Sequence, residues 1–325
     1  MHDITRRSAL GGIGLLLAGS AHAQPDAYPS RPVRLVVPFP PGGSTDVVGR
    51  LVAQGLQDAL GQPVVVENRA GSAGTVGSNF VKTTPADGYT LLMSNIGSQG
   101  IAPFVYRSVP YDTMRDFTHI GLMGTYYNVL LVNPRFSAQT LAEFIAEAKR
   151  RPGAINFATS GNGSSNHLLG ELLKLEAGVE LVHVPYRGAG PALTAAIGGE
   201  VPAMFDSIPS ASAHIRAGTL RALAISAPQR LSSVPGVPTF TELGLPRLVA
   251  HNWFGLSAPA GTPAAVVTRL SHALNAALAS PAIASKLVEV GFDIVPMEPP
   301  AFTGFVANQL GFWEDIVKRA GVTAN

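Results

Sequence analysis

Short apolar runs rich in β-branched residues alternate with stretches of helical periodicity, and this alternation limits the possible folds more than any other feature. After a run at residues 33–37, apolar residues recur at helical spacing over 47–60 and end at Gly61. We expect further strands at residues 64–66, 91–93, 155–158, 181–184, 203–205 and 220–225, and further helices at 75–82, 141–150, 168–175, 192–197 and 210–217. Such alternation predicts mostly parallel sheets with helices on both faces.

Two breaks divide the alternating pattern, near residues 121–133 and 227–238, and the second contains three prolines. Beyond it come a strand-like segment that ends at 253–256 and three helical stretches, each with a proline at its start, as suits a first helical turn. Because these closing helices have no full sheet of their own, we expect them to pack on the first unit. The sequence therefore predicts an α/β fold of two doubly wound lobes joined by a two-segment hinge, with lobe 1 formed by residues 24–124 and 228–325 and lobe 2 by 125–227.

The N-terminus has the pattern of a secretory signal peptide. Arg6 and Arg7 precede an uncharged stretch, and Ala21-His22-Ala23 provides small residues two apart. The apolar run at residues 9–19 is too short to span a bilayer, which needs about 20 residues. We expect cleavage after Ala23 and a periplasmic location; the arginine pair leaves both the general and the twin-arginine export routes open.

Composition excludes several classes of function. The net charge of +2 is nearly balanced, and no Lys/Arg run is interleaved with aromatic residues, so we expect no nucleic-acid partner. The absence of cysteine excludes disulfides, thiolate metal sites and cysteine nucleophiles. We expect a monomer with a large core, and neither a cofactor nor a metal.

The loop after the first expected strand has the features of an anion site. Its prolines stiffen it, its glycines let backbone amides approach a ligand, and Ser44 or Thr45 is expected to cap the next helix. The N–H groups and the positive dipole end of a helix N-terminus together attract anions. Asp46 has the alternative role of interacting with the helix dipole. The candidate ligand-binding residues here are Phe39, Pro41, Gly42, Gly43, Ser44, Thr45 and Asp46.

A second loop of glycines and small polar residues leads directly into another expected helix. It lacks the third glycine of a dinucleotide fingerprint and the Gly-Lys-Ser/Thr of a Walker loop, so neither of these phosphate sites is predicted. Its hydroxyls and amides are again suited to an anion at a helix N-terminus. The candidate residues are Ser160, Gly161, Asn162, Gly163, Ser164, Ser165, Asn166 and His167.

A third loop and the end of one more strand complete the candidate site. Tyr186 is suited to form an apolar wall, and Arg187 to pair with a carboxylate, although a solvated Arg187 is the alternative. Gly188 and Ala189 follow at the start of the next expected helix. Asp206 is suited either to accept a hydrogen bond from a ligand hydroxyl or ammonium or to cap a helix. Anion sites in two lobes predict one ligand held between them.

No motif points to catalysis. The chain has no Gly-x-Ser-x-Gly, since the nearest stretch, residues 163–167, ends in histidine. An exported hydrolase that uses Ser164 and a histidine stays as an alternative function. His167 and Glu171 lie four residues apart on an expected helix, but no second pair has metal-ligand spacing. The interpretation is a binding protein and not an enzyme.

An ordered set of motifs resembles the substrate-binding proteins of tripartite tricarboxylate transporters, the TctC/Bug family. The resemblance extends over essentially the whole chain after the signal peptide, and its specificity lies in the order of the set. The motifs are VPFPPGGSTD at 37–46, ENRAG at 67–71, DGYTL at 87–91, PYD at 110–112, HVPYRG at 183–188, LRALA at 220–224, VPTFTELG at 237–244 and WFGL at 253–256.

This resemblance implies a periplasmic binding protein with a Venus-flytrap fold that presents one small carboxylate to a membrane permease. The family's carboxylate grip would fall on residues 39–46 and 160–167, with residues 186–189 and Asp206 lining the variable part. Dicarboxylates, tricarboxylates, amino acids and aromatic acids are the candidate ligands, and the lack of a basic cluster favours low charge. A sensor module that signals to a membrane receptor is the alternative to transport.

Overall fold

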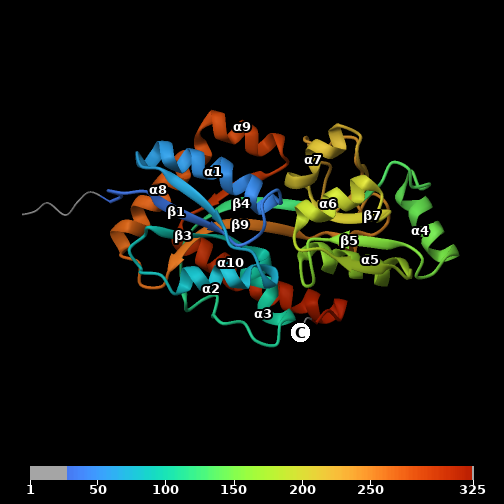
Figure 1. Cartoon of the computed structure of the whole chain (residues 1–325), viewed down its shortest axis with the longest axis horizontal. Helices are drawn as coiled ribbons and strands as arrows, with labels where there is room; N and C mark the ends of the chain where they lie inside the picture. The colour runs from blue at the N-terminus through green and yellow to red at the C-terminus, as the bar shows by residue number, and fades with distance from the viewer. Residues whose placement is uncertain (1–27, 324–325) are drawn as a thin grey trace, which may run out of the picture.

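The computed structural model describes residues 28–323, so the predicted signal peptide lies outside the described residues. Two α/β lobes lie side by side, and two strands labelled β4 and β9 run between the helices at the centre of the molecule (Figure 1). Lobe 1 contains the first and last parts of the chain, and lobe 2 contains the middle part. The predicted fold class is confirmed.

The sheet of lobe 1 combines parallel and antiparallel strands. β1 (Val33–Val37) pairs in parallel with β2 (Val64–Asn68) and β3 (Thr90–Asn95). β9 (His251–Pro259) is antiparallel to β3, and β4 (Phe117–Val132) is antiparallel to β9 and to β10 (Asp293–Met297). The expectation of mostly parallel sheets therefore holds only for β2, β1 and β3, on one side of this sheet.

The sheet of lobe 2 is built in the same way. Its parallel strands are β5 (Asn156–Thr159), β6 (Val182–Pro185) and β7 (Ala203–Ser207), with β5 between the other two. The far half of β4 is antiparallel to β7 and to β8 (Arg221–Ile225). β4 therefore belongs to both sheets, which form one ten-stranded system.

The predicted break at residues 121–133 is wrong, because this segment is part of the 16-residue strand β4. Gly121 and Gly124 lie inside this strand. They are needed where strands come close, since a Cβ added at Gly124 would lie 2.0 Å from the carbonyl O of Asp293. The register with β9 shifts beside both glycines, which marks bulges in a continuous strand.

Helices cover both faces of each sheet (Figure 1). In lobe 1, α1, α8 and α9 lie on one side and α2 and α10 on the other; in lobe 2, α6 and α7 lie opposite α5. The helices are α1 (Ser44–Leu60), α2 (Thr75–Lys82), α3 (Ala102–Val105), α4 (Leu141–Arg150), α5 (Ser165–Ala177), α6 (Ala189–Gly198), α7 (Ile208–Arg216), α8 (Ala264–Ala279), α9 (Pro281–Glu289) and α10 (Pro299–Ala320). Short helical turns are η1 (Ser72–Gly74), η2 (Gly97–Ile101) and η3 (Pro246–Leu248).

The buried apolar residues form a core for each lobe and one cluster that continues across both. Val33, Leu56 and Phe254 belong to the lobe 1 core, and Val129 and Met204 to that of lobe 2. Burial of such side chains contributes about 25 cal/mol per Å2 of apolar area, which makes these cores the main source of stability.

The C-terminal helix joins the two lobes. Trp313 and Val317 of α10 share an apolar cluster with Leu169 and Leu173 of α5, in lobe 2. The prediction that the last three helices pack on lobe 1 therefore omits this contact. The predicted domain limits, at 124/125 and 227/228, stay a prediction. None of the helices in residues 28–323 has the length and apolar character that crossing a bilayer requires.

Candidate ligand-binding site

A cleft between the lobes has an inner and an outer part. The inner part, here called the inner chamber, has a volume of about 50 Å3. Its lining comes from both lobes: Phe39, Pro40, Gly43, Ser44, Thr45, Ala73, Asn95, Ile96, Gly97, Tyr126, Ser160, Ser164, Ser165, Asn166, Ala189, Asp206 and Ser207.

The outer part, here called the outer groove, shares several of these residues and is larger, with about 540 Å3. Its further lining is Ala70, Gly71, Ser72, Gly74, Tyr106, Gly161, Asn162, Pro185, Tyr186, Arg187 and Gly188. A small ligand head has room in the chamber, and the rest of a longer ligand has room in the groove.

Lobe 1 presents the N-terminus of α1 to the inner chamber. Gly43 is the N-cap residue and no side chain caps the helix, so the prediction that Ser44 or Thr45 is the cap is wrong. These two residues instead form the first helical turn and line the chamber. The first N–H groups of a helix have no intrahelical acceptor, so this turn offers donors to a ligand.

Asp46 shapes this loop from behind and does not line the cleft. Its Oδ2 accepts hydrogen bonds from the Gly42 N–H at 3.1 Å and from Arg50 Nε at 3.1 Å. Asn68 Nδ2 donates to Asp46 Oδ1 at 2.9 Å and to the Phe39 carbonyl at 3.0 Å. Burial opposes ionisation, yet the bonds from Arg50, Asn68 and Gly42 hold the pKa of Asp46 below its usual value.

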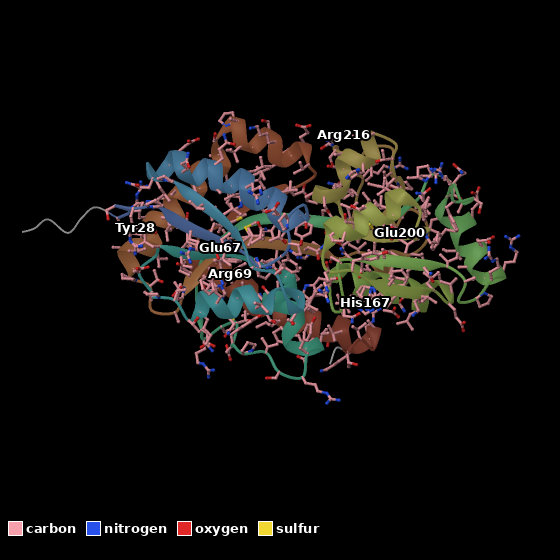
Figure 2. The ribbon with its side chains drawn as sticks, in the orientation of Figure 1. Tyr28, Glu67, Arg69, His167, Glu200 and Arg216 are labelled. Carbon is pink, nitrogen blue, oxygen red and sulfur yellow. The ribbon has the colours of Figure 1, made fainter. Side chains whose placement is uncertain are left out.

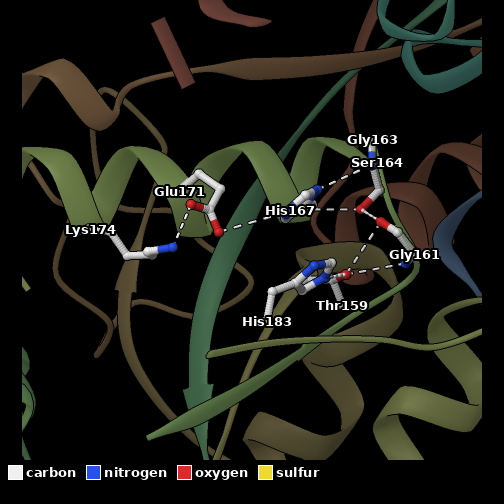
Figure 3. A network of polar contacts seen from close by, with 8 residues as sticks. All are labelled: Thr159, Gly161, Gly163, Ser164, His167, Glu171, Lys174 and His183. Carbon is white, nitrogen blue, oxygen red and sulfur yellow. Dashed lines mark hydrogen bonds and ion pairs between the residues drawn. The ribbon is translucent and has the colours of Figure 1, made fainter. Parts of the chain in front are cut away.

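Lobe 2 presents the N-terminus of α5 to the same chamber. Ser164 is the N-cap, and its Oγ accepts the N–H of His167 at 3.2 Å while it donates to the Gly161 carbonyl at 2.8 Å. The Gly161 N–H in turn donates to Thr159 Oγ1 at 3.2 Å (Figure 3). The loop that lines the chamber is therefore held in shape by hydrogen bonds from the strand and helix beside it.

Two stacked imidazoles support this loop from beneath (Figure 3). The rings of His167 and His183 lie 3.8 Å apart with 14° between their planes. Nδ1 of His167 accepts the N–H of Gly163 at 3.2 Å, and Nε2 of His183 lies 2.6 Å from Thr159 Oγ1. Burial, and then the neighbouring His167, lowers the pKa of His183 to about 3, so that ring is neutral at ordinary pH.

Helix N-termini dominate the electrostatics of the inner chamber. Besides α1 and α5, the first residue of α6, Ala189, and the N-cap of α7, Ser207, line it, and neither of these helices has a side-chain cap. No lysine or arginine is among the lining residues of the chamber. Partial positive charge without a full cation favours a ligand anion of low charge.

Of the residues that the structure describes, Asp206 is the one carboxyl group in the chamber lining, and its side chain is almost fully buried. Its exposed fraction is 1%, and burial raises its pKa to about 7. Ser210 Oγ donates to Oδ2 at 2.8 Å, whereas Oδ1 has no hydrogen-bond partner in the described chain. Asp206 is not the cap of α7, because Ser207 is at the N-cap position.

The two lobes contact each other across the cleft. A Cβ added at Gly43 would lie 3.5 Å from Cβ of Ala189, and one added at Gly188 would lie 2.7 Å from Cγ of Pro40. At the rim, Tyr106 Oη donates to the Asn162 carbonyl at 3.3 Å. The structure thus shows the lobes closed on each other.

Away from the cleft, an ion pair joins the lobes at their upper edge. Arg216 of α7 donates to the Glu289 carbonyl at 3.1 Å, and its guanidinium lies 3.6 Å from the carboxylate of the same residue. Figure 2 places Arg216 at the end of α7 that approaches lobe 1. Both side chains are exposed, so we expect this pair to contribute little to stability.

Most of the residues predicted as ligand contacts lie together in the cleft. Fifteen of the twenty line the chamber or the groove, and the exceptions are Pro41, Gly42, Asp46, Gly163 and His167. Those five lie in or next to the same loops and shape them. That these twenty residues contact a ligand stays a prediction.

Sequence reasoning missed several lining residues. Asn95 ends β3 and Ile96 and Gly97 follow it, and the rule that ligands lie beyond the carboxyl ends of strands could have found them. Tyr126 was missed because it lies inside β4, where a break was expected. In the turn around Ala73, the glycines at 71 and 74 are the only sequence feature that could have indicated a ligand-binding loop.

The hydrolase and metal alternatives find no support in the geometry of the described residues. Ser164 Oγ bonds to backbone groups, and no imidazole nitrogen is among its partners there. Nε2 of His167 lies 3.7 Å from the Glu171 carboxylate, which is a local pair on one helix face. Within residues 28–323, no group of three His, Asp or Glu side chains is placed to hold a metal ion.

Comparison with known proteins gives matches along nearly the whole chain. Residues 48–322 match the family model described as the tripartite tricarboxylate transporter family receptor. Protein BugT of Bordetella pertussis is 40% identical over 321 residues, which cover 98% of this chain and 98% of that protein.

Solved structures agree with this match. A structure described as that of a periplasmic transporter is 39% identical and has a TM-score of 0.89 over 91% of this chain and 99% of its own. An R. palustris protein solved with adipate is 35% identical, with a TM-score of 0.88 over 91% and 99% of the two chains. MatC of Rhodopseudomonas palustris with bound malate is 34% identical, with a TM-score of 0.83 over 89% and 100%.

Proposed function

Because the chain belongs to the tripartite tricarboxylate transporter receptor family, we propose that it captures one small carboxylate between its two lobes. The observation that carries this proposal is the convergence of the N-termini of α1, α5 and α6 on one chamber that no lysine or arginine lines. N–H donors and positive dipole ends at that point favour a carboxylate over a neutral or cationic ligand. Relatives solved with adipate and with malate support the same ligand class.

The carboxylate head binds in the inner chamber, where Ser44, Thr45 and Ser165 bring the first turns of two helices together. The rest of the ligand extends toward the outer groove, where Tyr186 and Arg187 set which groups are accepted. Fixed dipoles bind a carboxylate without an ion pair, so a full positive charge is not required.

After capture, the protein delivers the ligand to a membrane permease in the proposed function. The family match supports a periplasmic receptor, and the signal-peptide pattern that ends at Ala23 supports export. The closed lobes expose a shape that differs from an open form, which is what a permease would recognise. Signalling to a membrane receptor would use the same shape change and is the alternative use of a bound ligand.

A thermal-shift screen of the protein from Gln24 onward tests capture. The panel contains mono-, di- and tricarboxylates, amino acids and nicotinate-type acids, each against protein freed of co-purified ligand by unfolding and refolding. A ligand at about 100 times its Kd adds about 2.7 kcal/mol of stability, which raises Tm by a few degrees. A flat screen, together with ester turnover that Ser164→Ala abolishes, would replace this proposal with a hydrolase.

A further inference from the structure

The buried carboxyl of Asp206 faces a chamber that is otherwise built to receive an anion. Asp206 lies in β7, opposite Val129 of β4, and lines the chamber with an exposed fraction of 1%. Its Oδ2 is occupied by the Ser210 hydroxyl, but Oδ1 is buried and has no donor among the described residues. A buried carboxylate oxygen without a donor is costly, so its environment is completed by a proton, an ordered water or a ligand.

Among residues 28–323, no lysine or arginine lines the chamber beside Asp206. Of the elements packed around it, β4 presents Tyr126, whose pKa burial raises above its usual range, and α7 presents Ser210. The lining residues contributed by α1, α5 and α6 carry no full charge. Asp46 of α1 bonds to Arg50 and Asn68 and does not line the chamber.

We infer that Asp206 carries a proton in the ligand-bound protein and donates it through Oδ1 to an acceptor oxygen of the bound anion, so that capture is coupled to uptake of one proton from solvent. The inference rests on the proposed function, because it takes the ligand to be a carboxylate. It adds to that function the class of ligand group that Asp206 accepts, which is an anion with an acceptor oxygen directed at Asp206 and not an amine.

The coupling follows from charge alone. An anion beside an ionised, buried carboxylate meets repulsion that helix N-termini reduce but no lysine or arginine of the chamber lining neutralises, and this raises the pKa of the carboxyl above its value in the empty protein. Burial already raises the pKa of Asp206 to about 7 without a ligand. Between the pKa of the free protein and that of the complex, the free protein therefore holds Asp206 ionised and the complex holds it protonated, and the proton comes from solvent.

Calorimetric titration with malate and with adipate measures the coupling. Each titration is run at pH 7 and pH 9, in two buffers of different ionisation enthalpy, so that the number of protons taken up is obtained directly. We expect uptake of about half a proton at pH 7 and close to one at pH 9, with affinity falling about fivefold from pH 7 to pH 8 and about tenfold from pH 8 to pH 9. Binding without uptake, or with release of a proton, overturns the inference.

Variants separate Asp206 from other groups. Asp206→Asn keeps a donor at this position and removes the titration, so we expect its affinity to be independent of pH between 7 and 9. Asp58→Asn removes an exposed carboxyl from α1 and is the matched control; it should keep the wild-type pH dependence. A wild-type slope in Asp206→Asn would assign the proton to another group and overturn the inference.

A second measurement needs no ligand. A carboxyl whose pKa is higher in the folded chain than in the unfolded chain stabilises most at low pH, and this contribution is lost as pH rises from about 4 to about 7. The Tm of Asp206→Asn minus that of the wild type should therefore increase by several degrees between pH 5 and pH 7.5. If this difference in Tm does not change with pH, Asp206 does not carry the proton, and this result holds even if neither malate nor adipate binds. If no compound of the thermal-shift screen binds, the proposed function itself is wrong.

Discussion

Oδ2 of Asp46 accepts the N–H of Gly42 at 3.1 Å, so a carboxylate in the first turn of α1 holds the loop that leads into its own helix. The same carboxylate bonds to Arg50 and Asn68, and Asn68 reaches back to the Phe39 carbonyl. Although Asp46 does not line the cleft, this network fixes the residues that do.

Asp46→Ala should weaken carboxylate binding and the fold together. The substitution removes the acceptor of the Gly42 N–H and one of the two acceptors of the Asn68 amide. Because neither group is fully buried, we expect a loss of about 1 kcal/mol. Urea unfolding measures the loss of stability, and calorimetric titration with the best carboxylate of the screen measures the loss of affinity. Asp58→Ala, at an exposed position on the same helix, should change neither.

Equal affinity of Asp46→Ala and the wild type would show that the loop keeps its shape without this network. The side chain of Asp46 would then contribute to stability and not to ligand binding.

Gly43→Val should abolish binding while the chain stays folded. Gly43 has φ −85° and ψ 168°, which a β-branched residue can adopt, so the backbone is not strained. A Cβ at this position lies at ordinary contact distance, 3.5 Å, from Cβ of Ala189, but the two further methyl groups of valine would enter the space between helix and ligand. Circular dichroism checks the fold and titration calorimetry checks binding.

Gly43→Ala is the matched control, because one methyl group fits at 3.5 Å. It should retain binding. Undiminished affinity of Gly43→Val would show that the ligand does not approach the amides of α1.

The sequence allowed the lobes and most of the helices to be predicted, because their signals are local. The spacing of apolar residues marked α2 at Thr75–Lys82 and α4 at Leu141–Arg150 with their observed limits. Most residues of the cleft could be predicted from the loops that connect a strand to a helix, because the carboxyl ends of parallel strands meet at one edge of the sheet.

Features that depend on contacts between distant residues could not be predicted. The strand β4 contains Gly121 and Gly124, and only the approach of β10 explains why a glycine is required there. That Oδ1 of Asp206 has no hydrogen-bond partner among the described residues is likewise a result of packing. The sequence alone left two roles open for Asp206, ligand binding and helix capping. The contact of α10 with α5 depends on how the lobes meet.

Acid should destabilise the protein through His183. Burial and the stacked ring of His167 hold the pKa of His183 at about 3, well below the usual value near 6.5. Because the unfolded chain binds a proton at His183 that the folded chain does not, the contribution of His183 to stability should fall as pH decreases from about 6.5 toward 3, opposite in sign to the contribution of Asp206. His183→Gln should remove this contribution from the slope of unfolding free energy against pH.

The slope of that curve is the relevant measurement, since the substitution also alters the hydrogen bond to Thr159 and so the absolute stability. His272→Gln, at an exposed position on α8, should keep the wild-type slope. An unchanged slope in His183→Gln would assign the acid sensitivity to another group, of which the buried His119, with its pKa lowered to about 4 by burial, is the first candidate.

Gly188→Ala should prevent the lobes from closing. The added Cβ would lie 2.7 Å from Cγ of Pro40 in the other lobe, and φ of 120° is unfavourable for alanine. Small-angle scattering should show that saturating ligand reduces the radius of gyration of the wild type but not of this variant. Gly218→Ala separates the two effects, because Gly218 also has positive φ, 68°, but no atom lies within 4 Å of its added Cβ. It should close like the wild type; identical scattering of the wild type with and without ligand would contradict closure on binding.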